Sequence, residues 1–368
     1  MTALAVAAAV GAGALALPSP AAGQERGWPT QRSAADAGFE ELDRDTLDAI
    51  ERGVGWLARE QLSTSGRWPS TPQRYQMSVT ALAGLALLAH GDTPDSGKYS
   101  RQVRRAVEWI LESQRRTERG HRWHGLLFEG NDDPFEEGVE KPMPMHGHGF
   151  ALLFLAEAYG QTREPALRER MHEAITAAAR LTERSITPDG GWFYTPDSPR
   201  DEGSVTITQI QGLRSARNAG ISVDASVIDR AVNYIKASQD PKDGGVRYAL
   251  RWGKTSPALT AAGVSVLHAA GEYHGEALEK GYAYLRQHLT TDPNKHPFYF
   301  YTHLYAVQAM FQRGGPEWAH YFPEVRRELL AQRRGYPYWD SHYGKSYGTA
   351  IALLILQVPL RYLPIFQR

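Results

Sequence analysis

Cysteine is absent from this 368-residue chain, and so is an excess of charge of either sign. Without cysteine the chain has no disulfide, no thiolate metal ligand and no cysteine nucleophile. Lys and Arg together number 41, and Asp and Glu together also number 41, so the formal net charge is +0. A neutral chain without a basic stripe argues against nucleic acid as a partner. The phosphate loop and the H-E-x-x-H and G-x-S-x-G motifs are also missing, so no short motif names a reaction.

Long apolar runs are scarce, and the longest lies at the start of the chain. Residues 2–17 read TALAVAAAVGAGALAL and precede PSPAAGQERGW. The usual Lys or Arg before such a run is missing. The pattern still predicts a signal peptide over residues 1–23, a polar linker over 24–43 and export to the periplasm or cell envelope. A membrane span needs ~20 apolar residues, so we expect no transmembrane span in the mature chain.

A helical repeat fills most of the remaining sequence. Five apolar segments end at a glycine, namely Gly91, Gly160, Gly220, Gly271 and Gly314. These segments and a sixth open at Thr80, His148, Thr208, Thr260, His303 and Thr349. Such self-similarity is typical of repeat architectures, in which one helical unit cannot bury its apolar face alone.

The other half of each unit is an amphipathic stretch followed by a turn. An aromatic residue and then Gln recur at Trp56–Gln61, Trp109–Gln114 and Tyr234–Gln239. A turn with Gly and an aromatic follows, as in GRW at residues 66–68. The pattern predicts six units of helix, turn and helix. They begin near Asp45, Arg101, Ala166, Asp224, Glu276 and Pro323.

The unit QLSTSGRW at residues 61–68 resembles the Gln-Trp repeat of squalene and oxidosqualene cyclases. More broadly, it resembles the terpenoid cyclase and protein prenyltransferase repeat. The resemblance covers roughly residues 44–368. It implies an all-α fold, an α/α toroid (α6/α6 barrel) of six helical hairpins in a single domain over residues 44–368. In such a fold the ends of the inner helices surround a cavity.

The chemistry of these families is largely missing. Class II terpene cyclases use an acid in an Asp-x-Asp-Asp motif, and the nearest string here, residues 130–133, reads GNDD. Asp132 and Asp133 fall in a Glu-rich segment, where we expect hydrated, ionised carboxylates and therefore no squalene-type cyclisation. The prenyltransferase zinc site needs Cys. The pair His146 and His148 would need a third ligand to hold zinc, so we expect no metal and no cofactor.

The six opening residues define the candidate ligand site. In a toroid they lie near the N-terminal ends of the inner helices, where unpaired N–H groups suit an anion or a polarised oxygen. We therefore assign ligand binding to Thr80, His148, Thr208, Thr260, His303 and Thr349. The alternative is that Thr serves as a capping residue near a helix start. That alternative makes His148 and His303, which depart from Thr, the stronger catalytic candidates.

Aromatic and His residues are dense at 296–305 and 336–347. Neutral His and Tyr can serve as base and acid, so Tyr347 joins the catalytic candidates, and Asp340 is the best single acid candidate near this cluster. The alternative is that these aromatics lock adjacent hairpins together. In the segment before the third inner helix, Asp201 or Glu202 could point into the mouth of the toroid, but a solvated loop is the interpretation that we favour.

Three functions fit this sequence. The first is binding of a small hydrophobic or isoprenoid-like ligand, or of a peptide, in the central cavity. The second is a carbohydrate-active enzyme acting on a glycan, such as a polysaccharide lyase with His and Tyr as base and acid. An open polar groove with Arg near His or Tyr would favour it. The third is a noncatalytic interaction module, whose candidate side chains would all be used for capping and packing. The fold alone does not decide between them.

Overall fold

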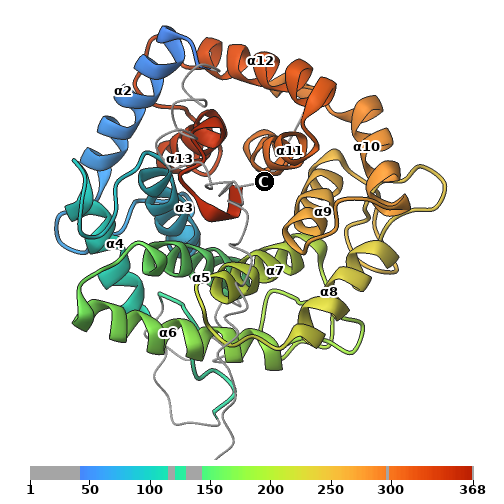
Figure 1. The fold of residues 1–368 in the computed structure, drawn as a ribbon, viewed down its shortest axis with the longest axis horizontal. Helices are drawn as coiled ribbons and strands as arrows, with labels where there is room; N and C mark the ends of the chain where they lie inside the picture. Colours follow the sequence, from blue (N-terminus) through green and yellow to red (C-terminus); the bar gives the residue numbers. More distant parts are fainter. Residues whose placement is uncertain (1–41, 115–120, 130–142, 296–297, 367–368) are drawn as a thin grey trace, which may run out of the picture.

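Six helical hairpins form a closed α/α toroid in the computed structural model, which describes residues 42–114, 121–129, 143–295 and 298–366 (Figure 1). The outer helices are α2 (Arg44–Glu60), α4 (Ser100–Ser113), α6 (Pro165–Arg184), α8 (Ala225–Ala237), α10 (Glu276–His288) and α12 (Gly315–Gln332). The inner helices are α3 (Gln76–Ala89), α5 (Pro144–Gly160), α7 (Gly203–Asn218), α9 (Pro257–Ala269), α11 (Tyr299–Arg313) and α13 (Lys345–Gln357). Short 3₁₀ helices are η1 (Gln73–Tyr75), η2 (Pro293–Lys295), η3 (Val358–Leu360) and η4 (Pro364–Phe366).

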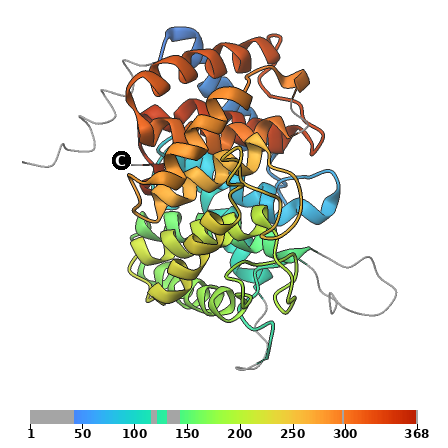
Figure 2. The same ribbon diagram turned by 90° about the vertical axis from the view of Figure 1, so that its right-hand side faces the viewer.

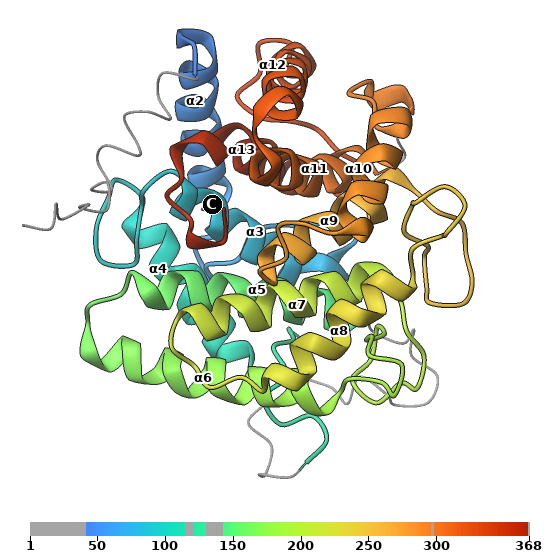
Figure 3. The ribbon, with the colours of Figure 1, turned by 45° about the vertical axis from the view of Figure 1, so that its right-hand side comes forward.

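The ring closes on itself. Each inner helix packs against the inner helices of the two neighbouring hairpins, and α13 packs against α3. The outer helix α12 likewise contacts α2. Figure 3 shows α6 and α8 lying outside α5 and α7. The predicted toroid is therefore confirmed. Within the described residues there is no β-sheet, and no helix is long and apolar enough to cross a membrane.

The two rings differ in how much of each helix is buried. Every residue of the inner helix α3 is buried. The outer helix α4 buries only one stripe, which includes Val103, Val107 and Ile110. A helix that is apolar all round belongs in a core, whereas a one-sided stripe belongs at the surface. The sequence pattern thus places the six opening segments inside the ring.

The repeated Gln and Trp residues hold each turn to the helices around it. The Gln61 amide donates to the carbonyl oxygens of Gly66 and Gln102, at 2.7 and 2.8 Å. Gln114 and Gln239 make the same two kinds of bond in their own hairpins. The Trp68 indole N–H donates to the Leu57 carbonyl at 2.7 Å. The motif that resembles the Gln-Trp repeat is therefore a structural joint between hairpins.

The turn glycine at the centre of this joint has no room for a side chain. Gly66 has φ of 87°, and a Cβ there would lie 2.7 Å from the Arg105 carbonyl of the next outer helix. Gly244, with φ of 79°, meets the Lys280 carbonyl at the same 2.7 Å. Only glycine combines this backbone conformation with such close contact.

The start of the sixth unit differs from the prediction. We expect it near Pro323 from the sequence, but α12 begins at Gly315 and contains Pro323 in its interior. The sequence GGP at residues 314–316 looks like a turn. Proline is nevertheless accepted in the first turn of a helix, because the N–H group that it lacks would have no helical partner there.

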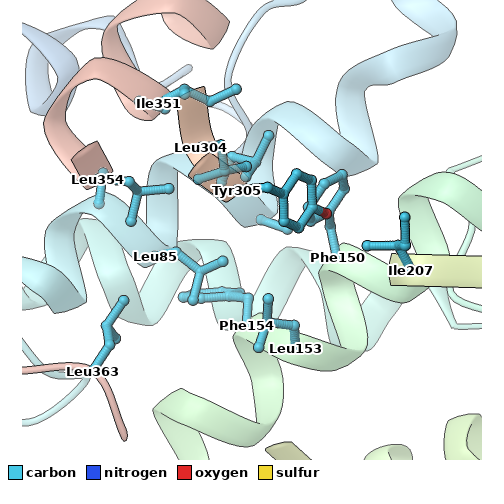
Figure 4. Close-up of a cluster of buried hydrophobic side chains, with 14 of the residues drawn as sticks. Leu85, Phe150, Leu153, Phe154, Ile207, Leu304, Tyr305, Ile351, Leu354 and Leu363 are labelled. Carbon is cyan, nitrogen blue, oxygen red and sulfur yellow. The ribbon is translucent and has the colours of Figure 1, made fainter. Parts of the chain in front are cut away.

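Apolar side chains fill the middle of the ring. Figure 4 shows Leu85, Phe154, Leu304 and Leu354 converging from four different inner helices. Leu363 of the C-terminal segment lies in the same buried cluster. That segment lies near the C-terminal ends of the inner helices, because Tyr362 adjoins Gly91 after α3. In Figure 2 the C-terminal end is on the left, opposite the turns that lead from outer to inner helices. The Gln357 amide, at the start of this segment, donates to the Ala86 carbonyl at 3.1 Å.

Some sequence predictions concern residues outside the described ranges. The signal peptide over 1–23, most of the linker over 24–43 and the acidic segment with Asp132 and Asp133 are among them. The export, domain-boundary and cyclisation expectations that depend on these residues stay predictions.

Candidate active site

The six opening residues all lie about one turn into their inner helices, and all except Thr208 lie at corresponding places. All are at most 1% exposed. The Thr80 hydroxyl accepts from the Trp68 N–H at 3.1 Å, and the Thr349 hydroxyl accepts from the Trp339 N–H at 3.0 Å. Thr260 accepts from the N–H of Val246, which stands where other turns have Trp. These threonines fasten the turn backbone, and their assignment to ligand binding stays a prediction.

In the third hairpin this role falls to Thr206. Its hydroxyl accepts from the Trp192 N–H at 2.9 Å. The hydroxyl of Thr208 instead donates to the Val205 carbonyl within the helix, at 2.8 Å. The register read from Gly220 is therefore displaced by two residues in this hairpin.

The two histidines among the openers are buried and hydrogen-bonded. His148 Nδ1 accepts from the Leu127 N–H at 3.1 Å, and its Nε2 lies 2.9 Å from the Thr182 hydroxyl. Burial lowers the pKa of His148 to about 3, so the ring is neutral near pH 7. His303 Nδ1 lies 2.8 Å from the Tyr321 hydroxyl. Both rings are enclosed among helices, and their catalytic assignment stays a prediction.

The other two candidates lie on the α12–α13 side of the ring. Asp340 is exposed, and its carboxylate accepts from the neighbouring Ser341 N–H. Tyr347 is partly exposed, and its ring centre lies 5.2 Å from that of Tyr343. Among the described residues, no hydrogen bond joins Asp340 to the other candidates, whereas Tyr347 belongs to a larger group of tyrosines.

We call this group the tyrosine rim. It lies at the N-terminal ends of the inner helices and in the turns before them, and its members are Tyr75, Tyr194, Tyr248, Tyr301, Tyr343 and Tyr347. All six side chains are partly exposed. The hydroxyls of Tyr194 and Tyr248 are 2.6 Å apart, and the rings of Tyr75 and Tyr343 are 5.5 Å apart.

A buried carboxyl group lies among these tyrosines. Glu202 is 1% exposed, so the favoured interpretation of a solvated loop is wrong for this residue. Its carboxylate accepts from the Val205 N–H at 2.8 Å and caps α7. Burial raises the pKa of Glu202, despite hydrogen bonds that lower it. Its charge in turn helps to raise the pKa values of Tyr194 and Tyr301, after the larger effect of burial.

Asp201, the neighbour of Glu202, has a different role. Its carboxylate accepts from the Tyr234 hydroxyl at 2.6 Å and from the Leu250 N–H at 2.9 Å. These bonds hold the turn to the outer helix α8 and to the following turn. The carboxylate of Asp201 thus has a structural role.

Glu202 is linked to a histidine through a serine. The Ser204 hydroxyl lies 2.8 and 2.7 Å from the two carboxylate oxygens of Glu202, and 2.9 Å from Nε2 of His146. Burial lowers the pKa of His146 to about 4, so its ring is neutral near pH 7. With Glu202 ionised, Ser204 donates to the carboxylate and Nε2–H donates to Ser204. Nδ1 of His146 is then a bare acceptor with no hydrogen-bond partner among the described residues.

His146 and His148 do not form a shared metal site. One ring faces Ser204, and the other faces Thr182. Within the described ranges, no group of three His, Cys, Asp or Glu side chains is arranged to hold a metal ion.

Two tyrosine hydroxyls of α11 are buried, that of the rim member Tyr301 and that of Tyr305. Within the part of the chain that is described, Oη of Tyr301 and Oη of Tyr305 are buried without a partner that meets hydrogen-bond geometry. Figure 4 shows Tyr305 beside Phe150, in the right-hand part of the apolar cluster. Buried polar atoms are normally satisfied, so unpaired hydroxyls mark a place where a polar group of a ligand can bind.

Comparison with known proteins supports the fold. The sequence matches no protein-family model and no curated protein. A variant of an α-1,6-mannanase from Salegentibacter sp. HEL1_6, in complex with α-1,6-mannotetrose, has a TM-score of 0.62 at 9% identity, covering 87% of this chain and 100% of that one. A variant of a type II terpene cyclase from Scytonema, in complex with geranylgeranyl dihydroxybenzoate, has a TM-score of 0.56 at 15% identity, covering 90% and 100%. A D-mannose isomerase has a TM-score of 0.50 at 13% identity, covering 78% and 86%.

These similar structures include glycan-acting and terpene-cyclising proteins. At such low identities they show the toroid and leave the activity open, because one fold hosts unrelated functions. Membership of the Gln-Trp repeat family in particular stays a prediction.

Proposed function

We propose that the protein is a carbohydrate-active enzyme, such as a polysaccharide lyase, that binds a glycan at the tyrosine rim. The observation that carries this proposal is a difference in side-chain polarity between the middle of the ring and its N-terminal end. Apolar side chains fill the middle of the ring, whereas partly exposed tyrosines and a buried carboxyl surround its N-terminal end. Sugars present hydroxyls for hydrogen bonding and apolar faces for stacking on aromatic rings. An isoprenoid needs an apolar cavity, and Phe154, Leu304 and Leu363 occupy that position here.

His146 is the proposed base. When its Nδ1 accepts a proton from the substrate, the Nε2 proton passes to Ser204, and the Ser204 proton passes to Glu202. The relay moves positive charge away from a ring that is poorly hydrated, which offsets the low basicity that burial imposes. Glu202 suits the final position because burial raises its pKa and makes it a better proton acceptor.

The hydroxyl pair of Tyr194 and Tyr248 is the proposed acid. Burial raises the pKa of Tyr194, so this hydroxyl stays protonated and can donate. In the elimination, His146 removes the proton on the carbon beside the sugar's carboxylate. A carbon–carbon double bond forms, the glycosidic C–O bond breaks, and the tyrosine hydroxyl protonates the leaving oxygen.

The sugar carboxylate needs a cation near the rim. The Arg200 guanidinium lies 4.7 Å from the Phe193 ring centre and is exposed. No carboxylate partner for it is found among the described residues. The positive charge of Arg200 acts to lower the pKa of Tyr248, against the larger effect of burial. Arg200 therefore lies on the same side of the rim as the proposed acid. Arg200 can therefore pair with an acidic sugar, because a planar guanidinium matches carboxylate geometry.

The test measures turnover of acidic polysaccharides such as polygalacturonate, alginate and hyaluronate, with neutral α-1,6-mannan alongside. Elimination gives unsaturated chain ends that absorb in the ultraviolet. We expect His146→Gln and Ser204→Ala to lower turnover by about 10²-fold or more. Glu202→Ser removes the carboxyl but keeps a capping side chain, because Ser256 caps α9 at the corresponding position.

The matched control is His320→Gln. His320 lies on the outer helix α12, and its side chain is 80% exposed. It should leave turnover unchanged. New reducing ends without ultraviolet absorbance would assign hydrolysis in place of elimination. Binding of geranylgeraniol without binding of any glycan would overturn the proposal as a whole.

We also propose that the protein is exported and is related to the terpenoid cyclase repeat family. The signal-like residues 1–23 and the Gln-Trp units support these two statements. Mass spectrometry of the native protein tests the first, and an intact Met1 in a cytoplasmic fraction would contradict it.

A further inference from the structure

A cavity of about 420 Å³ lies at the seam between the sixth and the first hairpins. Its lining includes Glu60, Thr71, Asp340, His342, Lys345 and Ser346. Ser346 is 3% exposed, and its hydroxyl has no hydrogen-bond partner among the described residues. A hydroxyl without a protein partner on a cavity wall is a group that a ligand can satisfy.

Aromatic rings stand beside this cavity. The rings of Tyr336 and Tyr338 are stacked with centres 5.2 Å apart, and the Trp56 ring centre also lies 5.2 Å from that of Tyr338. Tyr336 is 56% exposed. The Lys345 ammonium lies 4.3 Å above the Tyr338 ring, and Trp56 is one helical turn from Glu60, so the stack adjoins the cavity.

The chain segments that line the cavity also carry residues of the tyrosine rim. The turn that supplies Asp340 and His342 also supplies Tyr343, which contacts both Tyr75 and Tyr347. On the other wall, Thr71 lies four residues before Tyr75 in the chain, and its backbone N–H donates to the Tyr343 carbonyl at 3.3 Å. A chain bound across the rim would therefore leave it over Tyr343 and reach the cavity.

We propose that this seam cavity, with the ring stack beside it, is a second glycan subsite that binds a neutral sugar unit of the same chain. This inference rests on the proposed function of the rim. The two carboxylates of Glu60 and Asp340 outnumber the single ammonium of Lys345 in the lining, which disfavours an acidic sugar there, and their oxygens can accept from sugar hydroxyls. Tyr336, whose ring is held by Tyr338 and stays exposed, offers a flat face for stacking. The substrate is then a mixed glycan that places an acidic unit at the rim and a neutral unit at the seam.

The test measures binding of neutral tetrasaccharides, namely mannotetraose, cellotetraose and maltotetraose, by calorimetry and by saturation-transfer NMR. At least one should bind the wild-type protein. We expect Tyr336→Ala and Ser346→Ala each to weaken that binding by about tenfold, as truncation of a central contact does. Tyr273→Ala is the control, because Tyr273 is equally exposed, at 55%, but lies after α9, away from the seam. Thermal melts establish that each variant is folded.

The outcomes separate the two proposals. Absence of neutral binding in the wild-type protein, or equal losses in the seam and control variants, would overturn the seam subsite. His146→Gln should leave neutral binding unchanged, because it alters only the rim. If acidic glycans are neither bound nor turned over while seam binding persists, the proposed function of the rim fails and the seam site stands.

Discussion

Replacing Thr206 with valine removes one hydroxyl and keeps the branched shape of the side chain. The hydroxyl oxygen accepts from the Trp192 backbone N–H at 2.9 Å, and the hydroxyl donates to the Glu202 carbonyl at 2.8 Å. Thr206 is 0% exposed and Trp192 is 1% exposed. In the variant the Trp192 N–H is buried without a partner. We expect a loss of about 1–3 kcal/mol in the free energy of unfolding, the usual cost of such a group.

Thr208→Val is the matched control on the same helix. Thr208 is 1% exposed, and its hydroxyl donates to the Val205 carbonyl and accepts from the Gln209 side chain. The Gln209 amide keeps its 2.7 Å bond to the Met145 carbonyl when that hydroxyl is lost. No backbone N–H is left unpaired, so we expect a loss below about 1 kcal/mol.

Urea unfolding, followed by circular dichroism and by tryptophan fluorescence, measures both losses. A shift of the midpoint with an unchanged slope reports stability alone. Equal losses, or a larger loss for Thr208→Val, would refute the assignment of the repeat register to Thr206.

Three further outcomes can be checked by similar means. Gly149→Ala should lower the unfolding free energy by about 1–3 kcal/mol, because its Cβ would lie 2.5 Å from the Thr208 hydroxyl oxygen. Gly160→Ala meets nothing within 4 Å and should not destabilise the protein. Burial raises the pKa of Glu157 to about 7 from its ordinary 4.5, so the folded protein holds this proton more tightly than the unfolded chain does. The stabilisation is complete below about pH 4.5 and is lost as the pH rises through about 7, and Glu157→Gln should remove this part of the pH dependence.

Much of the fold could be predicted because its signals are local and recur. Gln61, Gln114 and Gln239 make the same pair of bonds, and each follows an aromatic residue at a fixed spacing. The third hairpin lacks this aromatic-Gln pair, and its register was misplaced by two residues. The sixth outer helix was also misplaced, because a proline in the first helical turn looks like a turn residue in the sequence.

The candidate site was harder to predict because it consists of residues that differ from those at the same positions of the other hairpins. A loop such as residues 200–206 looks solvated from its charges alone. Asp201 and Glu202 are adjacent, yet one holds the turn together and the other lies buried among tyrosines. No local sequence signal distinguishes the roles of Asp201 and Glu202. Their difference in burial comes from tyrosines of α11 and of the turn before α9, which are distant in the sequence.

The repeat itself supplies the comparison that distinguishes Glu202. Ser256 stands at the corresponding position of the fourth hairpin, where its hydroxyl caps α9 by accepting from Leu259 N–H. Thr260 then bonds to the Ser256 carbonyl as Thr206 bonds to that of Glu202. A serine is therefore sufficient to cap an inner helix at this position. A buried carboxyl there adds a desolvation cost that the fold does not require. The buried carboxyl therefore supports the proposed chemistry of the rim, in which Ser204 and His146 connect Glu202 to a bound glycan.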